Sequence, residues 1–426
     1  MTQLIESNRA KDSLARLPIT LRVLYAAGPG DVIGTYSYWV EGQDDPSQVA
    51  LTYSGQFYQV CHELEAKAYV ISSCSERKSL QDKRFKIKHR PIPLQSASGL
   101  LYHLGQIWYG LRLIASAIRF RANVAVVASG TTHWFVLSLL SLLGVQVIPS
   151  LHCVLWRKYI PQRKVEKLLL KLNRNLFAKH CTDILTASED ISEQLAQLTA
   201  NQHLPIRRFL PTYSRTEFAG VGKPDENRSP FRVLFVGRIE SDKGVFDVLE
   251  IAKRFASQGR QDITFDLCGN GSMLESLRLA AKEAGIDSSF VCHGHCNKPQ
   301  MREMFKQAHV VIVPTRKDFI EGFNQVVVES VLCGRPVVTS AVCPALAYVR
   351  NAAVEVAPND IKAYGDALLK LCDDRQFYEQ KRRGCIGAQE QFYDPSRSWK
   401  AALKSILVES SQAKVSLKYS QLSSSN

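Results

Sequence analysis

The sequence predicts an α/β protein made of two doubly wound domains, each with a parallel sheet between layers of helices. Three observations predict this architecture. Short apolar runs alternate with amphipathic helical stretches in the first half of the chain, which is typical of βαβ units. The same alternation restarts in the second half, after a segment at residues 211–230 that carries three Pro and two Gly. The length of 426 residues suits two or three domains.

In the first half, we expect strands at residues 21–27, 68–73, 123–128, 145–149 and 183–186. Helices are expected within 41–65 and at 94–120, 133–143 and 159–179. The Gly-rich turn GPGDVIG follows the first strand, and residues 77–90 are expected to form a basic loop. In the second half, strands are expected at 232–237, 263–268, 290–293, 309–314 and 336–340. The helices between them are expected at 244–258, 272–284, 298–307 and 324–333, and further helices close the chain at 360–372, 377–391 and 396–410.

These elements give the expected domain limits. A flexible leader at 1–18 precedes a Rossmann-like domain at 19–212 and a linker at 213–230. A second Rossmann-like domain follows at 231–393, then a helix at 394–410 that we expect to pack back on the first domain. The Ser-rich tail at 411–426 is expected to be disordered.

Composition narrows the class of protein. Apolar residues make up 45% and charged residues 22%, as in an ordinary globular protein, which argues against a disordered, collagen-like or coiled-coil chain. No secretory leader is visible at 1–20, and the most apolar window, 133–149, is too short for a comfortable membrane span. Eleven Cys at scattered spacings fit reduced thiols better than a disulfide framework. We therefore expect a cytoplasmic protein.

The charge is uneven. Lys and Arg number 54 against 40 Asp and Glu, a net charge of +14. Residues 1–212 hold 25 basic and 15 acidic side chains (+10), and residues 213–426 hold 29 and 25 (+4). The excess in the first half indicates an anionic partner there, such as nucleic acid, an anionic membrane surface or a phosphorylated substrate, although a merely solvated basic surface is the plainer alternative.

Candidate site residues lie where strands of the second half end, because open parallel sheets bind ligands at that edge. Arg238 and Lys243 follow Gly237, and such cations suit a diphosphate. Gly271 belongs to a G-x-G turn that precedes a helix, which is weak evidence on its own. The acids Glu321 and Glu329 flank a helix start, and Glu329 lies in the otherwise apolar run VVVESVLCG, where a carboxylate needs a partner.

The second half resembles the donor domain of the family-4 retaining glycosyltransferases, which have the GT-B fold. The resemblance is carried by FVGRIESDKG, DLCGNGSMLESL, FVCHGHC and the segment from HVVIVP through EGFNQVVVESVLCGRPVV, which contains the family's E-x7-E signature. It implies that Glu329 holds the nucleotide ribose, that Glu321 lies by the donor sugar and that Arg238 and Lys243 bind the diphosphate. It places Gly237, Gly271, Gly322, Phe323 and Asn324 beside the donor, and Asn324 departs from the Gly that many members have there.

The first half resembles the family's acceptor domains more loosely. Gly28, Gly30 and Gly34 stand where the family has a loop near the donor phosphates and the acceptor, and His152 stands where it often has a His beside the donor sugar. Ser188 matches a family Ser after a strand and is equally a helix N-cap. The run from Cys292 to Cys296 lacks zinc-ligand spacing, and we predict no metal site there.

The resemblance implies a metal-independent transferase that moves a sugar from a UDP- or GDP-linked donor to an acceptor hydroxyl with retention, in polysaccharide or glycolipid biosynthesis. No cofactor beyond the donor is expected, and no nucleic acid partner, since aromatic residues are not interleaved with the basic ones. Two alternatives stay open: a sugar-nucleotide epimerase of the same architecture, and a non-catalytic protein that binds a nucleotide or another anion.

The acceptor is expected to be a sugar or a lipid-linked molecule. Seven cations lie between Arg77 and Arg90, and six more lie between Arg157 and Lys171, in and before a helix with a Leu-rich face. These features would suit an anionic membrane, so peripheral binding to its inner face is one expectation. The alternative is that the Leu-rich face packs on the sheet and the cations are only solvated.

Overall fold

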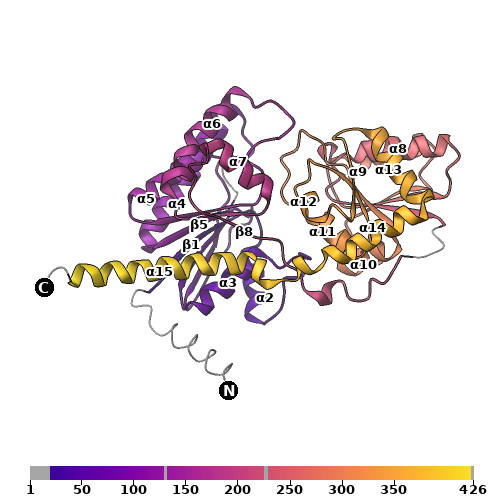
Figure 1. The fold of residues 1–426 in the computed structure, drawn as a ribbon. Coiled ribbons are helices and arrows are strands. Elements are labelled where there is room, and N and C mark those ends of the chain that lie inside the picture. Colours follow the sequence, from indigo (N-terminus) through magenta and orange to yellow (C-terminus); the bar gives the residue numbers. More distant parts are fainter. Residues whose placement is uncertain (1–19, 129–131, 225–228, 424–426) are drawn as a thin grey trace, which may run out of the picture.

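The computed structural model describes residues 20–128, 132–224 and 229–423, and it confirms two α/β domains (Figure 1). The expected leader at 1–18 lies outside these ranges. The first sheet has eight strands in the order β3-β4-β2-β1-β5-β6-β7-β8, parallel except for β3. Its strands are β1(Arg22–Ala27), β2(Lys67–Ser72), β3(Ser79–Asp82), β4(Phe85–His89), β5(Val124–Ala128), β6(Gln146–Leu151), β7(Ile184–Thr186) and β8(Ile206–Arg208).

Helices connect these strands. They are α2(Val32–Val40), α3(Tyr53–Glu63), α4(Gly99–Phe120), α5(Ser138–Leu142), α6(Lys164–Asn175) and α7(Glu189–Thr199), with shorter turns at η1(Trp134–Leu137) and η2(Leu176–His180). Asp31 caps α2 by accepting from the amides of Ile33 and Gly34, and Ser188 caps α7. Because each connection returns the chain to the same edge, the carboxyl ends of the parallel strands all meet at the edge that faces the second domain.

The second domain has a six-stranded parallel sheet in the order β11-β10-β9-β12-β13-β14. Its strands are β9(Phe231–Val236), β10(Ile263–Cys268), β11(Phe290–Gly294), β12(Val310–Val313), β13(Val337–Ser340) and β14(Ala353–Val356). Its helices are α8(Val245–Ser257), α9(Leu274–Glu283), α10(Lys298–Gln307), α11(Gln325–Leu332), α12(Leu346–Val349), α13(Ile361–Asp373) and α14(Arg375–Ala388), with short turns η3(Arg215–Glu217), η4(Ser241–Lys243), η5(Glu390–Phe392) and η6(Pro395–Arg397). Val233 and Leu234 of β9 enter different core clusters, so both faces of the sheet are covered, as in a doubly wound domain.

The last helix, α15(Trp399–Ser423), returns to the first domain (Figure 1). Trp399, Leu403 and Leu407 are fully buried in that domain's core cluster. The chain passes between the domains twice, once near Leu210 and once near Arg397. The two segments lie side by side, and the Leu210 amide donates to the Arg397 carbonyl at 2.9 Å. The first domain is therefore completed by a segment that follows the second domain in the sequence.

The structure contains α7, β8, α12 and β14, which the sequence analysis did not name, and it differs from the expectations in other places as well. Residues 77–90 are not a loop but contain the hairpin of β3 and β4, in which side chains of β4 are alternately buried and exposed. Helix α2 begins inside the Gly-rich turn, where only a loop was expected. The tail expected to be disordered from 411 is helical as far as Ser423. In the Leu-rich segment of α6, for which membrane contact and packing on the sheet were both left open, Val165, Leu168 and Leu172 are exposed, whereas Leu169 and Leu170 are half-buried. None of the described helices is long and apolar enough to cross a bilayer.

Candidate functional site

The two domains meet through a short antiparallel contact at the edge where their strands end. Cys153, just beyond β6, forms a β-bridge with Gly322 of the loop that follows β12. Next to it, the Val154 amide donates to the Glu321 carbonyl at 3.2 Å. This contact places the backbone of Cys153 and Val154, which directly follow His152, against Glu321 and Gly322 of the second domain.

The Glu321 carboxylate is buried and held by four donors. Its Oε2 accepts from Lys243 Nζ at 2.7 Å, Thr315 Oγ1 at 3.0 Å and Asn324 Nδ2 at 3.1 Å. Its Oε1 accepts from the Gly322 amide at 3.0 Å. A carboxylate fixed in this way has lost its rotational freedom before any ligand arrives, which is how a binding group is preorganised.

Two predicted cations share one aromatic neighbour. Lys243 Nζ lies 3.8 Å from the centre of the Phe319 ring, and Arg238 Cζ lies 5.5 Å from it. Lys243 ends the turn η4, and the next residue, Gly244, has φ +75. A Cβ on Gly244 would lie only 2.3 Å from the Pro314 carbonyl oxygen, at the end of β12. Only glycine fits there, which fixes Lys243 beside the β12 loop. Arg238 itself is exposed and open to a ligand.

His152 is enclosed by aromatic and polar neighbours. Its ring centre lies 4.4 Å from that of Tyr53, and its Nε2 lies 2.9 Å from Ser150 Oγ. The Trp399 indole of α15 donates to the same Ser150 oxygen at 2.9 Å. Burial lowers the pKa of His152 to about 4, so the imidazole is neutral at physiological pH.

The backbone conformation of Asn324 explains why Asn can stand where many family members have Gly. Asn324 has φ +64, in the left-handed region that Gly occupies freely and Asn tolerates better than most residues. The same backbone is therefore reached with a different side chain, and that side chain binds Glu321. Asn324 does not cap α11 with its side chain, so the first amides of this helix face the site without a side-chain partner.

Glu329 lies one helical turn farther along α11 and is 7% exposed. Among the described residues, no hydrogen bond or ion pair involves its carboxyl group. Burial raises its pKa to about 7, and the nearby Glu217 adds to this increase, while Lys298 opposes it. A buried carboxyl group without a protein partner is costly, so this group awaits a donor from elsewhere.

The predicted glycines mostly serve the protein itself. A Cβ at Gly271 would lie 2.1 Å from the Ile239 carbonyl oxygen, and the helix start that follows is occupied by Glu240, which accepts from the Ser272 amide at 2.8 Å. The Gly237 amide donates to Cys268 between the strand ends of β9 and β10. The Phe323 side chain packs on Tyr348 in the core, so only its backbone can face the site.

The Gly-rich turn of the first domain also lacks an open helix start. A Cβ on Gly28 or Gly30 would meet no other atom within 4 Å, so neither glycine is required by close packing. A Cβ at Gly34 would lie 2.7 Å from the Asp31 carboxylate, which already occupies the first amides of α2. An anion at this turn would have to compete with that carboxylate.

The run from Cys292 to Cys296 has partners of its own: His293 Nε2 lies 2.7 Å from Asp266 Oδ1. Within the described ranges, no three His, Cys, Asp or Glu side chains gather as a metal-binding group would.

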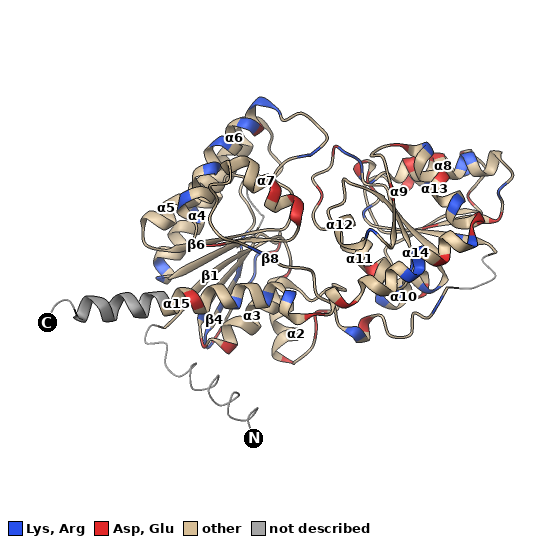
Figure 2. Cartoon of the chain, viewed as in Figure 1, with Lys and Arg blue, Asp and Glu red and all other residues tan. Residues whose placement is uncertain are grey.

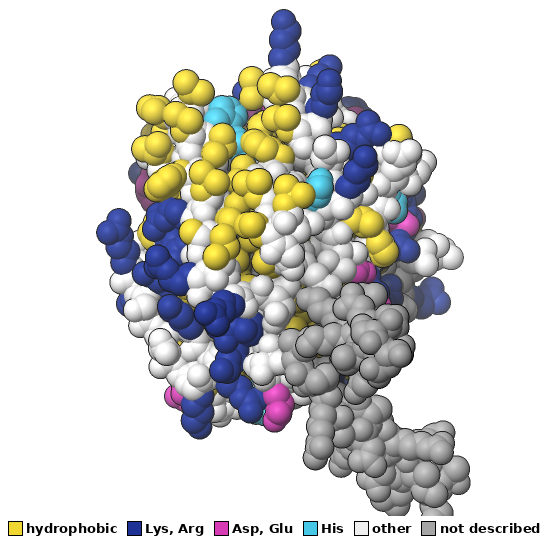
Figure 3. Space-filling model, turned by 90° about the vertical axis from the view of Figure 1, so that its left-hand side faces the viewer, with side chains coloured by type: hydrophobic (Ala, Val, Ile, Leu, Met, Phe, Trp, Pro, Cys, Tyr) yellow, Lys and Arg dark blue, Asp and Glu magenta, His cyan; other side chains and the backbone are white. Residues whose placement is uncertain are grey.

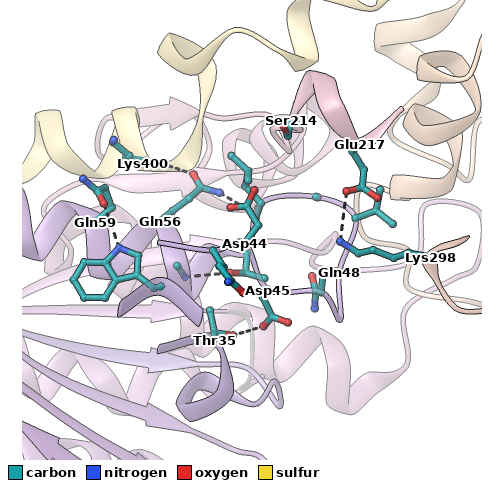
Figure 4. Close-up of a pocket in the computed structure, with 17 residues that line it drawn as sticks. Thr35, Asp44, Asp45, Gln48, Gln56, Gln59, Ser214, Glu217, Lys298 and Lys400 are labelled. Carbon is teal, nitrogen blue, oxygen red and sulfur yellow. Dashed lines mark hydrogen bonds and ion pairs between the residues drawn. The ribbon is translucent and has the colours of Figure 1, made fainter. Parts of the chain in front are cut away.

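Two pockets open between the domains. A small one beside the β-bridge is lined by Val154 and Tyr159 of the first domain and by Phe319 and Glu321 of the second. A larger one, of about 290 Å³, lies between α2, α3, the linker and α10 (Figure 4). Its labelled side chains are polar: Thr35, Asp44, Asp45, Gln48, Gln56, Gln59, Ser214, Glu217, Lys298 and Lys400. Glu217 and Lys298 line this pocket and form an ion pair at 3.5 Å. They are the two charged residues that act on the pKa of Glu329.

Comparison with known proteins identifies the second domain. Residues 221–389 match the sequence model of the family described as glycosyl transferases group 1. These residues belong to the group 1 glycosyltransferases. The chain is also 30% identical, over 138 residues, to a D-inositol 3-phosphate glycosyltransferase from Arthrobacter sp. strain FB24, a match that covers 32% of this chain and 31% of that protein. The chain thus spans about a third of the length of such relatives.

Solved structures extend the likeness to both domains. HepE from Anabaena in complex with UDP superposes with a TM-score of 0.62 at 13% identity, over 93% of this chain and 100% of that one. Sucrose-phosphate synthase from Thermosynechococcus elongatus superposes with a TM-score of 0.63 at 12% identity, over 95% and 100%. Across the described residues, the fold of the two domains together is therefore GT-B.

The structure thus brings Arg238, Lys243 and Glu321 together, with the start of α11 beside them through Asn324. The residue after His152, Cys153, reaches this group through its backbone contact with Gly322. The Glu329 carboxyl group lies farther along α11, near Glu217 and Lys298. The sequence did not reveal Thr315, Phe319, Tyr53 or Trp399. Thr315 and Phe319 lie in the loop between the β12 strand and Glu321, so their position in the matched segment was a usable signal. Tyr53 and Trp399 come from distant parts of the chain, and nothing local marked them.

Proposed function

We propose that this chain is a retaining glycosyltransferase that moves a sugar from a nucleoside diphosphate sugar to an acceptor hydroxyl group. The observation that carries the proposal is Glu329, a buried carboxyl group without a partner among the described side chains, on a helix of the group 1 domain. Ribose hydroxyls are donors of the right kind for it. Bound to the ribose, the carboxylate would gain the hydrogen bonds that compensate for its burial.

The diphosphate would lie between the start of α11 and the two cations. Uncapped amides at a helix start attract anions, and Arg238 and Lys243 add positive charge where the leaving group gains negative charge. These two side chains can do the work that a divalent metal does in other transferases, which supports a metal-independent reaction. Lys243 would then exchange part of its contact with Glu321 for a phosphate oxygen.

The donor sugar would lie against Glu321 and His152 at the β-bridge. Glu321 can accept from sugar hydroxyls, since each carboxylate oxygen has more than one acceptor site. His152 is neutral, so it can offer a hydrogen bond without placing a positive charge beside the reacting carbon. Retention follows if the acceptor hydroxyl attacks from the face that the diphosphate leaves, with the leaving oxygen taking the acceptor proton.

UDP is the preferred nucleotide in this proposal and GDP the second candidate, because HepE, which shares the fold, was solved with UDP. The acceptor would be a sugar or a lipid-linked molecule, in the making of a polysaccharide or glycolipid. The larger interdomain pocket, rich in carboxylate and amide groups, has the chemistry to bind a hydroxyl-rich acceptor.

The test is a screen of UDP- and GDP-sugars for release of the nucleoside diphosphate, with and without candidate acceptors. Acceptor-stimulated release, with a product whose anomeric proton coupling matches that of the donor, supports the proposal. Isomerised nucleotide sugar without net release would identify an epimerase instead. Nucleotide binding without any turnover would identify a non-catalytic binding protein.

A further inference from the structure

One face of the first domain exposes large apolar side chains across three helices. On α4, Leu100 is 73% exposed and Trp108 57%, and on α5 Leu142 is 70% exposed. Figure 3 shows a broad, largely apolar area on this face of the first domain, on the side of the molecule away from the second domain. The exposed apolar residues of this face are Leu100, Leu101, Leu104, Trp108, Leu111, Ile118, Leu139, Leu142, Leu143, Val165, Leu168 and Leu172, which we call the apolar face. Contiguous patches of this kind mark interaction sites.

Cations border the apolar face on both sides (Figure 3). On α6, Lys164, Lys167 and Lys171 follow the same spacing as the exposed Val165, Leu168 and Leu172, so a basic stripe runs beside an apolar one. On the other side, Lys86 of β4 lies over the Tyr69 ring, which in turn contacts Phe120 at the end of α4. The basic hairpin of β3 and β4 is therefore a neighbour of α4.

Acidic residues are missing from this part of the chain. Between Asp82 and Glu166 the sequence contains no Asp or Glu, and Figure 2 accordingly shows no red on α4 or α5. Across the described residues, Lys86, Lys88, Lys167 and Lys171 enter none of the ion pairs. A surface that combines exposed Leu and Trp with unpaired cations fits a partner that is apolar inside and anionic at its surface.

We propose that the apolar face and its bordering cations dock on an anionic lipid bilayer. A second copy of this chain is a poor occupant, because its matching face would bring cation against cation with no acid to pair them. A nucleic acid would satisfy the cations and leave the leucines in water. A bilayer satisfies both: the apolar side chains enter the interface while Lys and Arg bind lipid phosphates.

The experiment is co-sedimentation of the full chain with vesicles of phosphatidylcholine alone and of phosphatidylcholine mixed with equal parts of phosphatidylglycerol. We expect binding to the anionic vesicles only, and a weaker association at high salt. Replacing Lys167 and Lys171 by Glu should lower the partition coefficient at least about fivefold for each cation removed. Replacing Leu101 and Trp108 by Ser should lower it about tenfold or more.

Matched variants separate docking from general stickiness. Leu279 and Ile386 are as exposed as Trp108 but lie in the second domain, and Lys282 is an exposed cation of α9. Leu279→Ser with Ile386→Ser, and Lys282→Glu, should leave the partition coefficient unchanged. Trp108 also provides a direct readout, since its fluorescence should be quenched by vesicles of brominated lipid, and Trp108→Phe should remove that change.

Three results would overturn the proposal. One is the absence of binding to the anionic vesicles at low salt. Another is binding that the control variants weaken as much as the variants of the apolar face. The third is a chain that does not bind the vesicles and forms a dimer in solution, where the double variant Leu101→Ser, Trp108→Ser is monomeric. That result would assign the apolar face to self-association. Because none of these readouts depends on turnover, they are independent of the proposed transferase activity.

Discussion

At the scale of single residues, burial favours the neutral form of both Glu329 and His152, although it shifts their pKa values in opposite directions. It raises the pKa of Glu329 to about 7 and lowers that of His152 to about 4, because in each case the charged form is desolvated. His152 is thereby fixed in its neutral form over the physiological range. Glu329 is left near the midpoint of its titration, where a ligand can change its charge.

Nucleotide affinity is therefore expected to depend on pH. Ribose hydroxyls bind the ionised carboxylate more strongly than the acid, so the affinity for UDP should rise between pH about 6 and 8 as Glu329 loses its proton. Glu329→Gln should flatten this dependence and weaken binding by roughly 1–3 kcal/mol. Isothermal titration calorimetry across this range measures both effects, with the exposed Glu283→Gln as the control. A pH dependence that survives in Glu329→Gln would assign the effect to another group.

Glu329 should also make the protein less stable as the pH rises. Its folded pKa of about 7 exceeds its ordinary value of 4.5, so the folded state binds more protons than the unfolded state between these values. Stability contributed by the protonated group is fully present below pH 4.5 and is lost as the pH rises toward 7, by roughly 3 kcal/mol. Urea unfolding at both ends of that window should show a decrease in the wild type that Glu329→Gln lacks.

The two cations should matter for turnover more than for folding. Arg238→Ala and Lys243→Ala each remove a charge from the place where the leaving diphosphate gains its own, and each should lower kcat on the order of 10²–10³-fold. Steady-state kinetics with parallel thermal melts separates rate from stability. The exposed Lys282→Ala should keep the wild-type rate, and near-normal rates in both site variants would remove the diphosphate assignment.

Local sequence predicted those site residues that lie in one continuous segment. Glu321 and Glu329 share a loop and its helix, and Lys243 follows a strand end, so their positions after strands, together with the family resemblance, predicted that they lie at one edge of the sheet. Tyr53 and Trp399 contact the site of His152 from α3 and from the far end of the chain. Their aromatic side chains look like ordinary core residues in the sequence, because only the tertiary fold brings them to that strand end.

At the scale of elements, most strands were predictable because buried parallel strands are short apolar runs, whereas the partly exposed β8 and β14 were not predicted. Helix α2 was not, since VIGTYSYWV is poor in strong helix formers, and the helix depends on the Asp31 cap and on packing of Tyr36. The hairpin of β3 and β4 was missed for another reason. The alternation of apolar and basic residues in FKIKH is typical of a strand. The high density of charge, four cations in six residues, instead led to the prediction of a loop.

Helix α15 is expected to stabilise the first domain although it follows the second. Leu403 is fully buried in the first domain's core, so Leu403→Ala should lower the free energy of unfolding by about 2–5 kcal/mol through lost burial and a cavity. Hydrogen exchange should show the loss of protection in β1 and α3, with the second domain unaffected. Leu279→Ala, at an exposed position, should change stability little. Equal loss of protection in both domains would mean that they unfold as one unit.

At the scale of the whole molecule, the candidate site draws its residues from both domains. Glu321 and Lys243 belong to the second domain and His152 to the first, and the bridge between Cys153 and Gly322 joins them. A further contact, from the Tyr159 hydroxyl to the Ala341 carbonyl at 3.3 Å, crosses the same gap. The paired crossings near Leu210 and Arg397 lie on the other side, where they can serve as a hinge.

Gly322 offers a test of whether catalysis needs that closed arrangement. A Cβ there would lie 3.2 Å from the His152 carbonyl oxygen and 3.6 Å from Cys153 Sγ, so Gly322→Ala should push the two domains apart by a few tenths of an ångström. We expect a decrease in kcat of about tenfold for Ala and up to about 10²-fold for Val, since small misplacements of reacting groups are costly. The affinity for UDP should change little, because the groups proposed to bind it lie within the second domain. Stopped-flow turnover and calorimetry on the same variants separate the two effects. Should UDP affinity fall in parallel with kcat, Gly322 would belong to the nucleotide site rather than to the contact between domains.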